Sequence, residues 1–159
     1  MSAVILRAPM RSRITDVPPG AGADFAIARG LVGIGEALDR PPRSLADAIL
    51  ALTRAYGEKS GRMVARFADL PDGAFVWTRQ RDGDYRLGRI CGGWRYDDSP
   101  AARTVGIHHV RPAVWTPARF DEVTVPNAVA RTFARGGRNL QRIHDPAIEQ
   151  QTLDAWVDA

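Results

Sequence analysis

The segment from residue 73 to residue 96 constrains the fold more than any other part of the chain. Its sequence is GAFVWTRQRDGDYRLGRICGGWRY, with apolar residues at a period of two on both sides of RDGD. That period is typical of strands, and a short turn rich in Asp and Gly joins antiparallel neighbours. We therefore expect a β-hairpin over residues 73–96, with a bulge at Gly92 and Gly93.

Aromatic and basic side chains share this hairpin. The aromatic residues are Trp77, Tyr85, Trp94 and Tyr96, and the arginines between them are Arg79, Arg81, Arg86, Arg89 and Arg95. Aromatic faces stack on bases and guanidinium groups hold phosphates, so the combination is typical of nucleic-acid binding. The alternative is that the same aromatic residues form the hydrophobic core of the sheet.

Apolar spacing and capping residues predict the other elements. We expect helices over residues 24–28, 44–56, 58–68 and 128–134, and strands over residues 31–38, 104–115 and 140–143. Ser44 followed by Asp47 is a capping box that begins the second helix. A chain of 159 residues is long enough for one domain with a real core. We predict an α+β fold: a small, curved, partly open β-barrel with helices packed at its edges.

The chain divides into three segments. Residues 1–22 are predicted to be an N-terminal arm, because they contain Pro9, Pro18 and Pro19 and end in glycine-rich sequence. Residues 23–144 hold the expected strands and helices. Residues 145–159 are expected to form a terminal helix that packs on them.

Positive charge is concentrated in parts of the sequence. The net charge is +4, residues 1–13 and 127–144 hold arginines without any acidic residue, and the last fifteen residues are acidic. Segregated charge of this kind builds a field that an anionic polymer can follow, so nucleic acid is the first partner to consider. The alternative is a set of scattered, solvated arginines.

The sequence offers no set of residues for catalysis. Its histidines are His108, His109 and His144, which lack the spacing of a metal site, and one cysteine excludes an internal disulfide and a thiolate zinc cage. We expect no catalytic residue, no metal and no cofactor. No apolar run is long enough to span a bilayer or serve as a signal peptide. We therefore expect a cytoplasmic, nucleoid-associated protein without a membrane partner.

Several short motifs occur in a familiar order. They are Val32-Gly33-Ile34-Gly35, the strand from Gly73 to Trp77, Tyr85-x-Leu-Gly-Arg-Ile, Trp94-Arg95-Tyr96, His109-x-Arg-Pro-x-x-Trp and Gly137-x-x-Leu-Gln-x-Ile. This order resembles the PUA-like superfamily, specifically the EVE-like modules at the N-termini of modification-dependent restriction endonucleases. The resemblance covers about residues 25–144. Glu36 stands where these relatives often place Trp.

The resemblance implies that residues 23–144 form a domain whose cavity receives one modified base, flipped from its helix. We expect 5-methylcytosine in DNA, recognised without cleavage by a monomer or weak dimer. The expected base pocket comprises Trp77, Trp94, Tyr96, Gly33, Gly35, Glu36 and Asp97, and the expected contacts to the nucleic-acid backbone are Arg13, Arg79, Arg81, Arg89, Arg95 and Arg111. The alternatives are an RNA-binding module that reads a modified base and a protein-binding adaptor in phage defence.

Overall fold

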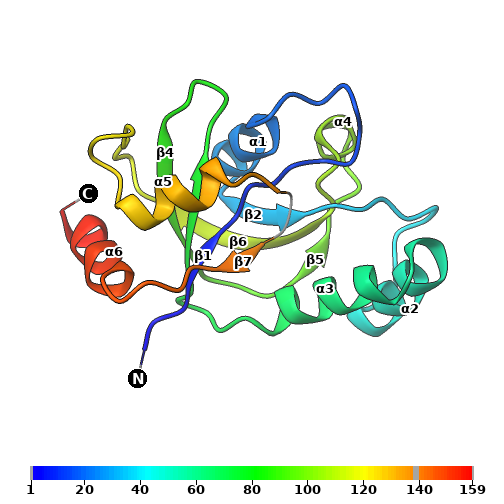
Figure 1. Cartoon of the computed structure of the whole chain (residues 1–159). Helices are drawn as coiled ribbons and strands as arrows, with labels where there is room; N and C mark the ends of the chain where they lie inside the picture. Colours follow the sequence, from blue (N-terminus) through cyan, green and yellow to red (C-terminus); the bar gives the residue numbers. More distant parts are fainter. Residues whose placement is uncertain (1, 138–139, 159) are drawn as a thin grey trace.

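The computed structural model describes residues 2–137 and 140–158 of the chain. They form an α+β fold in which a mixed sheet curls into an open half-barrel (Figure 1). The strands are β1 (Ile5–Arg7), β2 (Leu31–Ile34), β3 (Phe75–Arg79), β4 (Tyr85–Ile90), β5 (Arg95–Tyr96), β6 (His109–Trp115) and β7 (Gln141–Arg142). Their order is β2-β6-β4-β3-β1-β7, and β5 pairs with β6 outside this path.

Helices pack on both faces and at the open side of the sheet. They are α1 (Ala21–Arg29), α2 (Leu45–Tyr56), α3 (Glu58–Asp69), α4 (Pro100–Val105), α5 (Asn127–Ala134) and α6 (Ile148–Val157). The start of α2 is capped as the sequence predicts, because the Ser44 hydroxyl accepts a hydrogen bond of 3.0 Å from the Asp47 amide.

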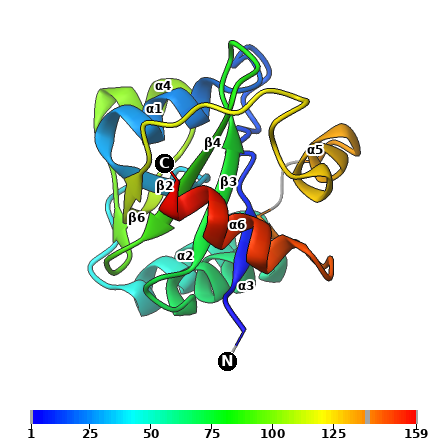
Figure 2. The same cartoon turned by 90° about the vertical axis from the view of Figure 1, so that its left-hand side faces the viewer.

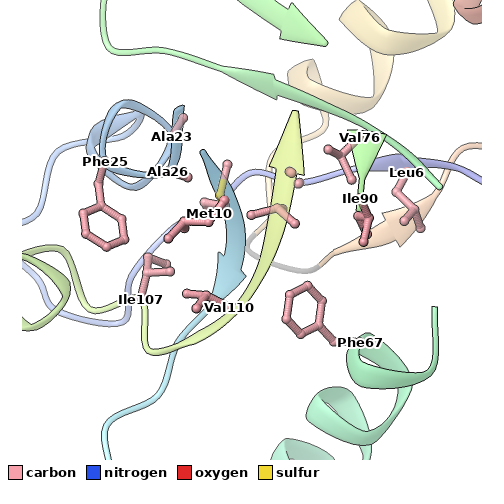
Figure 3. Close-up of a cluster of buried hydrophobic side chains, with 14 of the residues drawn as sticks. Leu6, Met10, Ala23, Phe25, Ala26, Phe67, Val76, Ile90, Ile107 and Val110 are labelled. Carbon is pink, nitrogen blue, oxygen red and sulfur yellow. The ribbon is translucent and has the colours of Figure 1, made fainter. Parts of the chain in front are cut away.

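Alternation along the strands gives the sheet two separate cores. Inside the curl, Val76 belongs to a cluster with Phe67, Ile90 and Val110, and Figure 3 shows Phe67 reaching from α3 toward the sheet. The neighbouring residue Trp77 points the other way and is buried in a second cluster under α5 and α6. Figure 2 shows α6 on this outer face, where Trp156 packs edge-on against Phe75 with ring centroids 5.5 Å apart.

The predicted hairpin is correct for residues 75–90 and wrong beyond them. β3 and β4 pair antiparallel, but β5 leaves β4 and pairs with β6. The chain changes direction at Cys91, whose amide donates to the Pro112 carbonyl over 2.9 Å. Gly92 lies so close to the Pro112 ring that a Cβ there would be 2.7 Å from Cγ. The glycine therefore permits a crossing to the neighbouring strand and not a bulge within one hairpin.

Residues 1–22 are not an arm along their whole length. β1 lies inside the sheet, parallel to β3 and antiparallel to β7, and residues 5–10 are buried. The partner strands lie far away in the sequence, so no local pattern reveals this pairing.

The expected strand over residues 104–115 is also shorter than predicted, because α4 occupies its beginning. Ser99 caps this helix and Gly106, with a φ of 71°, ends it before β6 begins at His109.

Candidate functional site

A cavity of about 450 Å³ lies at the end of the half-barrel where the chain leaves β2. Its walls are formed by residues 10–14, residues 34–37, Tyr56, Met63 and residues 106–108. The volume falls within the range of about 300–1,000 Å³ that is usual for small-ligand sites. Five segments of the chain, from three distant parts of the sequence, therefore meet around a space large enough for a small ligand.

Glu36 is the acidic residue among the described residues that line this cavity. Its Oε1 accepts a hydrogen bond of 2.8 Å from the Ser60 hydroxyl and lies 3.6 Å from the Arg13 guanidinium. Its Oε2 is buried and has no hydrogen-bond partner within residues 2–137 and 140–158. Leaving a buried acceptor unsatisfied costs about 1–3 kcal/mol, so a ligand N–H that donates to Oε2 would recover that free energy.

Gly35 allows the chain to pass close to the end of α4 just before Glu36. A Cβ at Gly35 would lie 2.4 Å from the Gly106 carbonyl oxygen, so only glycine allows this approach of β2 to the end of α4. Gly33, the other glycine predicted for the pocket, is buried, and a Cβ there would meet Ile107 at 2.5 Å. Gly35 therefore lines the cavity, whereas Gly33 serves the packing of the core.

Trp94 and Tyr96 lie next to the cavity and support residues 36–38, which follow β2. The Trp94 indole N–H donates to His109 Nδ1 over 3.2 Å, and His109 Nε2 lies 3.0 Å from the Glu36 carbonyl. The Tyr96 hydroxyl accepts from the Leu38 amide over 2.9 Å. Neither aromatic side chain is among the residues that line the cavity. Their contacts in the structure support residues 36–38, and their expected role in stacking on a base stays a prediction.

The protonation of the two histidines follows from these partners. An indole N–H only donates, so His109 Nδ1 must accept and Nε2 carries the hydrogen that is donated to Glu36. Burial lowers the pKa of His109 to about 4, which keeps the ring neutral. His108 Nδ1 lies 2.9 Å from the Asp97 carbonyl and donates to it, and the His108 ring stacks on Tyr96 at 5.4 Å.

Trp77 was predicted for the base pocket, and this prediction is wrong. The side chain is fully buried in the outer core, with an exposed fraction of 0 %. Its indole N–H donates to Thr152 Oγ1 over 3.1 Å, and its ring packs edge-on against Phe120. The ring has no free face for a base and lies on the opposite side of the sheet from Val76 and the inner core.

Asp97 also lies outside the cavity walls. It is buried, and its Oδ1 accepts a hydrogen bond of 2.9 Å from the Ser99 amide at the start of α4. Burial acts to raise the pKa of Asp97, but the hydrogen bonds from Ser99, together with the charges of Arg95 and Arg29, outweigh it and the pKa is lowered. The carboxylate is already engaged in the turn before α4, so Glu36 is the better acceptor for a ligand.

The six arginines predicted to contact phosphates do not gather around the cavity. Arg13 lines it, whereas Arg79 pairs with Glu122 at 2.8 Å and Arg89 lies over the Phe75 ring on the outer face. Arg81 and Arg95 are exposed in the hairpin turn and in β5.

Arg111 is a structural residue, so its predicted role in phosphate binding is wrong. Its side chain is 3 % exposed and pairs with Asp72 at 2.8 Å. Its guanidinium also donates to the carbonyls of Gly92, Phe67 and Leu70. The contacts with Phe67, Leu70 and Asp72 tie β6 to the end of α3, and the contact with Gly92 ties it to the crossing between β4 and β5. They leave no exposed charge for a phosphate.

A groove that the sequence analysis missed adjoins the cavity. It has a volume of about 670 Å³ and shares Ile34 and Met63 with the cavity walls. Its basic residues are Lys59, Arg66, Arg135, Arg142 and His144. Two signals point to it in the sequence: the stretch 127–144 without acidic residues, and the spacing of seven between Lys59 and Arg66, which places both on one helix face.

Comparisons with protein-family models, with curated proteins and with solved structures find no match for this chain. Within residues 2–137 and 140–158, no helix has the length and apolar character needed to cross a membrane. Across the same residues, no three His, Cys, Asp or Glu side chains are grouped so that they could hold a metal ion. The functional argument therefore rests on the cavity, on Glu36 and on the adjoining basic groove.

Proposed function

We propose that the protein binds nucleic acid and receives one base, 5-methylcytosine, in the cavity beside Glu36, as a binding protein and not as an enzyme. The observation that carries this proposal is a carboxylate, Glu36, in the wall of a cavity beside a basic groove, with one oxygen that has no hydrogen-bond partner among the described residues. The proposal includes a PUA-like, EVE-like identity for the half-barrel, which the order of the sequence motifs supports.

The chemistry of the cavity suits cytosine. The exocyclic amino group of cytosine is a donor, and Glu and Asp side chains accept from it in protein–DNA complexes. Glu36 offers an acceptor without a competing partner, and Met10, Ile14 and Met63 offer apolar contacts to a C5-methyl group. Burial of one methyl group contributes about 0.8 kcal/mol, so we expect a preference of roughly fourfold for the methylated base.

Flipping a base out of a duplex costs free energy that contacts in the cavity have to offset. Taking a base out of a duplex costs a few kcal/mol. The hydrogen bond to Glu36 and the contacts with Tyr56 and the apolar walls have to offset this cost. A single-stranded target avoids it, so both forms belong in the experiment.

The direct test is fluorescence anisotropy with two duplexes of equal sequence, one with a central 5-methylcytosine, at matched salt. We expect the methylated duplex to bind several-fold more tightly. Glu36→Gln should weaken capture of the base, because its amide places a donor opposite the amino group, and the methyl preference should fall with it because the C5-methyl contacts form only when the base is in the cavity. Glu58→Gln is the matched control, because it makes the same charge change at an exposed position of α3 that does not line the cavity.

Two results contradict the proposal in different ways. Equal affinity for the two duplexes at every salt concentration rules out recognition of the methylated base. Tighter binding of an RNA of the same sequence, with the same sensitivity to Glu36→Gln, assigns the cavity to a base in RNA.

A further inference from the structure

The open side of the half-barrel contains a groove that is distinct from the cavity. The two edge strands of the sheet are β2 and β7, and α3 lies across the opening between them (Figure 1). We call this depression the α3–β7 groove. Its basic rim is Lys59, Arg66, Arg135, Arg142 and His144, and its apolar floor includes Met63, Leu70 and Leu140.

The rim carries positive charge that the protein itself does not neutralise. All of its basic side chains are exposed, and no described residue that lines the groove is acidic. Among the ion pairs of residues 2–137 and 140–158, none involves Lys59, Arg66 or Arg142, although Arg62 and Arg131 near them are paired. An anionic polymer would relieve the repulsion within this rim.

Arg7 lies on the other face of β1 from the groove, close to Arg135. Burial and the neighbouring Arg135 lower the pKa of its guanidinium. The Arg7 side chain donates to the carbonyls of Thr132 and Gly136 and has no carboxylate partner among the described residues.

The apolar floor of the groove favours binding of a single strand over binding of a duplex. Met63, Leu70 and Leu140 are half-buried, so they offer apolar surface between the charged walls. A duplex presents phosphates and hides the faces of its bases, whereas an unpaired strand presents both. Proteins that bind single strands combine a positive groove with surfaces on which base faces can rest.

We propose that the α3–β7 groove binds a segment of single-stranded nucleic acid, from the same strand as the base held beside Glu36. This inference rests on the proposed function, because the groove and the cavity share Ile34 and Met63 in their walls and therefore lie next to each other. Phosphates contact Lys59, Arg66 and Arg142 on the rim, and the base faces lie over the apolar floor.

The experiment measures salt-dependent binding of a short DNA strand with one 5-methylcytosine, its unmethylated twin and the corresponding duplex. Arg66→Ala and Arg142→Ala should each weaken binding of both strands equally. Each should also reduce the slope of log affinity against log salt by about 0.7, the value for one phosphate contact with a single strand. Arg89→Ala is the matched control, because Arg89 is exposed on the outer face over Phe75 and Trp156. Thermal melts establish that each variant is folded.

We expect the single strand to bind more tightly than the duplex. Groove variants with unchanged affinity and salt slope overturn the proposal, as does an Arg89→Ala variant that loses as much as they do. A duplex that binds at least as tightly as the strand, with the same sensitivity to the variants, also overturns it. Displacement of the strand by polyglutamate of equal charge and concentration would identify a general polyanion surface instead.

The outcomes separate this inference from the proposed function. If the parent protein shows no base preference but loses binding in the groove variants, the groove assignment stands and base recognition fails. If Glu36→Gln removes a base preference and the groove variants change nothing, base recognition stands and the groove assignment fails. A parent protein that binds no oligonucleotide at low salt refutes both.

Discussion

The indole N–H of Trp94 donates a hydrogen bond of 3.2 Å to Nδ1 of His109. The opposite nitrogen of the same ring donates to the Glu36 carbonyl, so one imidazole connects the indole to the backbone of the cavity loop. Trp94 is thus a positioning residue: it acts on the cavity without lining it.

Trp94→Phe should separate the hydrogen bond from the ring contact. The phenyl ring can still stack on His109, but Nδ1 loses its donor. We expect the free energy of unfolding to fall by about 1–3 kcal/mol, and the preference for the methylated base to weaken because the Glu36 segment is less firmly held. Chemical denaturation and anisotropy measure the two effects.

Trp115→Phe is the control for this change. It also removes an indole hydrogen bond, in this case to the Leu31 carbonyl, but at a distance from Glu36 along β2. It should lower stability and leave the base preference unchanged. Equal loss of preference in both variants would show that general loosening, and not the Trp94–His109 contact, is responsible.

Stability should depend on pH through His109. Burial lowers the pKa of this ring to about 4 in the folded protein, whereas it titrates near 6.5 in the unfolded chain. Between these values the unfolded chain binds a proton that the folded protein does not bind. The free energy of unfolding should therefore fall as pH decreases from about 6.5 to about 4, by roughly 3 kcal/mol in total.

Urea denaturation at a series of pH values measures this slope. His109→Gln should remove the part of this pH dependence that comes from the His109 ring. The exposed His144 provides the control, since His144→Gln should preserve the slope. A parent protein whose stability is flat between pH 6.5 and 4.5 would contradict a buried neutral His109.

Trp77 should behave as a core residue and not as a ligand-binding one. Trp77→Ala is expected to lower the free energy of unfolding by about 3–5 kcal/mol. Trp77→Phe and Thr152→Val each remove one partner of the same hydrogen bond, so their effects should be non-additive in a double-mutant cycle. Base preference in the folded fraction of every variant should equal that of the parent.

Arg111 and Arg79 should differ in their effect on stability. Arg111→Met leaves the carbonyls of Phe67 and Leu70 without their buried donor, and we expect a loss of about 3–5 kcal/mol. Arg79→Met breaks a partly exposed pair with Glu122 and should change stability by less than about 1 kcal/mol. Thermal and urea unfolding measure the stability of both variants. If Arg111→Met and Arg79→Met lose the same stability, the structural role of Arg111 is contradicted.

Local patterns predicted the local parts of this structure. The cap of α2 at Ser44 and the pairing of β3 with β4 depend on residues close together in the sequence. Alternation also separates the two faces of a strand, but it does not say which face a helix covers. For that reason Trp77 was placed in a pocket, although α6 covers its side of the sheet.

The site itself depends on contacts that no local pattern contains. The sequence places Glu36 in the expected pocket, whereas its unpartnered oxygen and its hydrogen bond with Ser60 depend on the assembled fold. The α3–β7 groove combines Arg66 from one helix with Arg142 from a distant strand. The sequence shows that Arg66 and Arg142 are charged, but it does not show that they lie close together.

The position of β1 has a consequence for the way the protein is made. Ile5 pairs with Phe75, and Leu6 pairs with Arg142. During synthesis the first strand therefore leaves the ribosome long before either of its neighbours exists. Contacts between such distant residues form slowly, and apolar strand edges that wait for their partners are prone to aggregate. The two walls of the groove can be joined only after the segment with Arg142 and His144 has been translated, so the binding surface forms after the other strands of the sheet have left the ribosome.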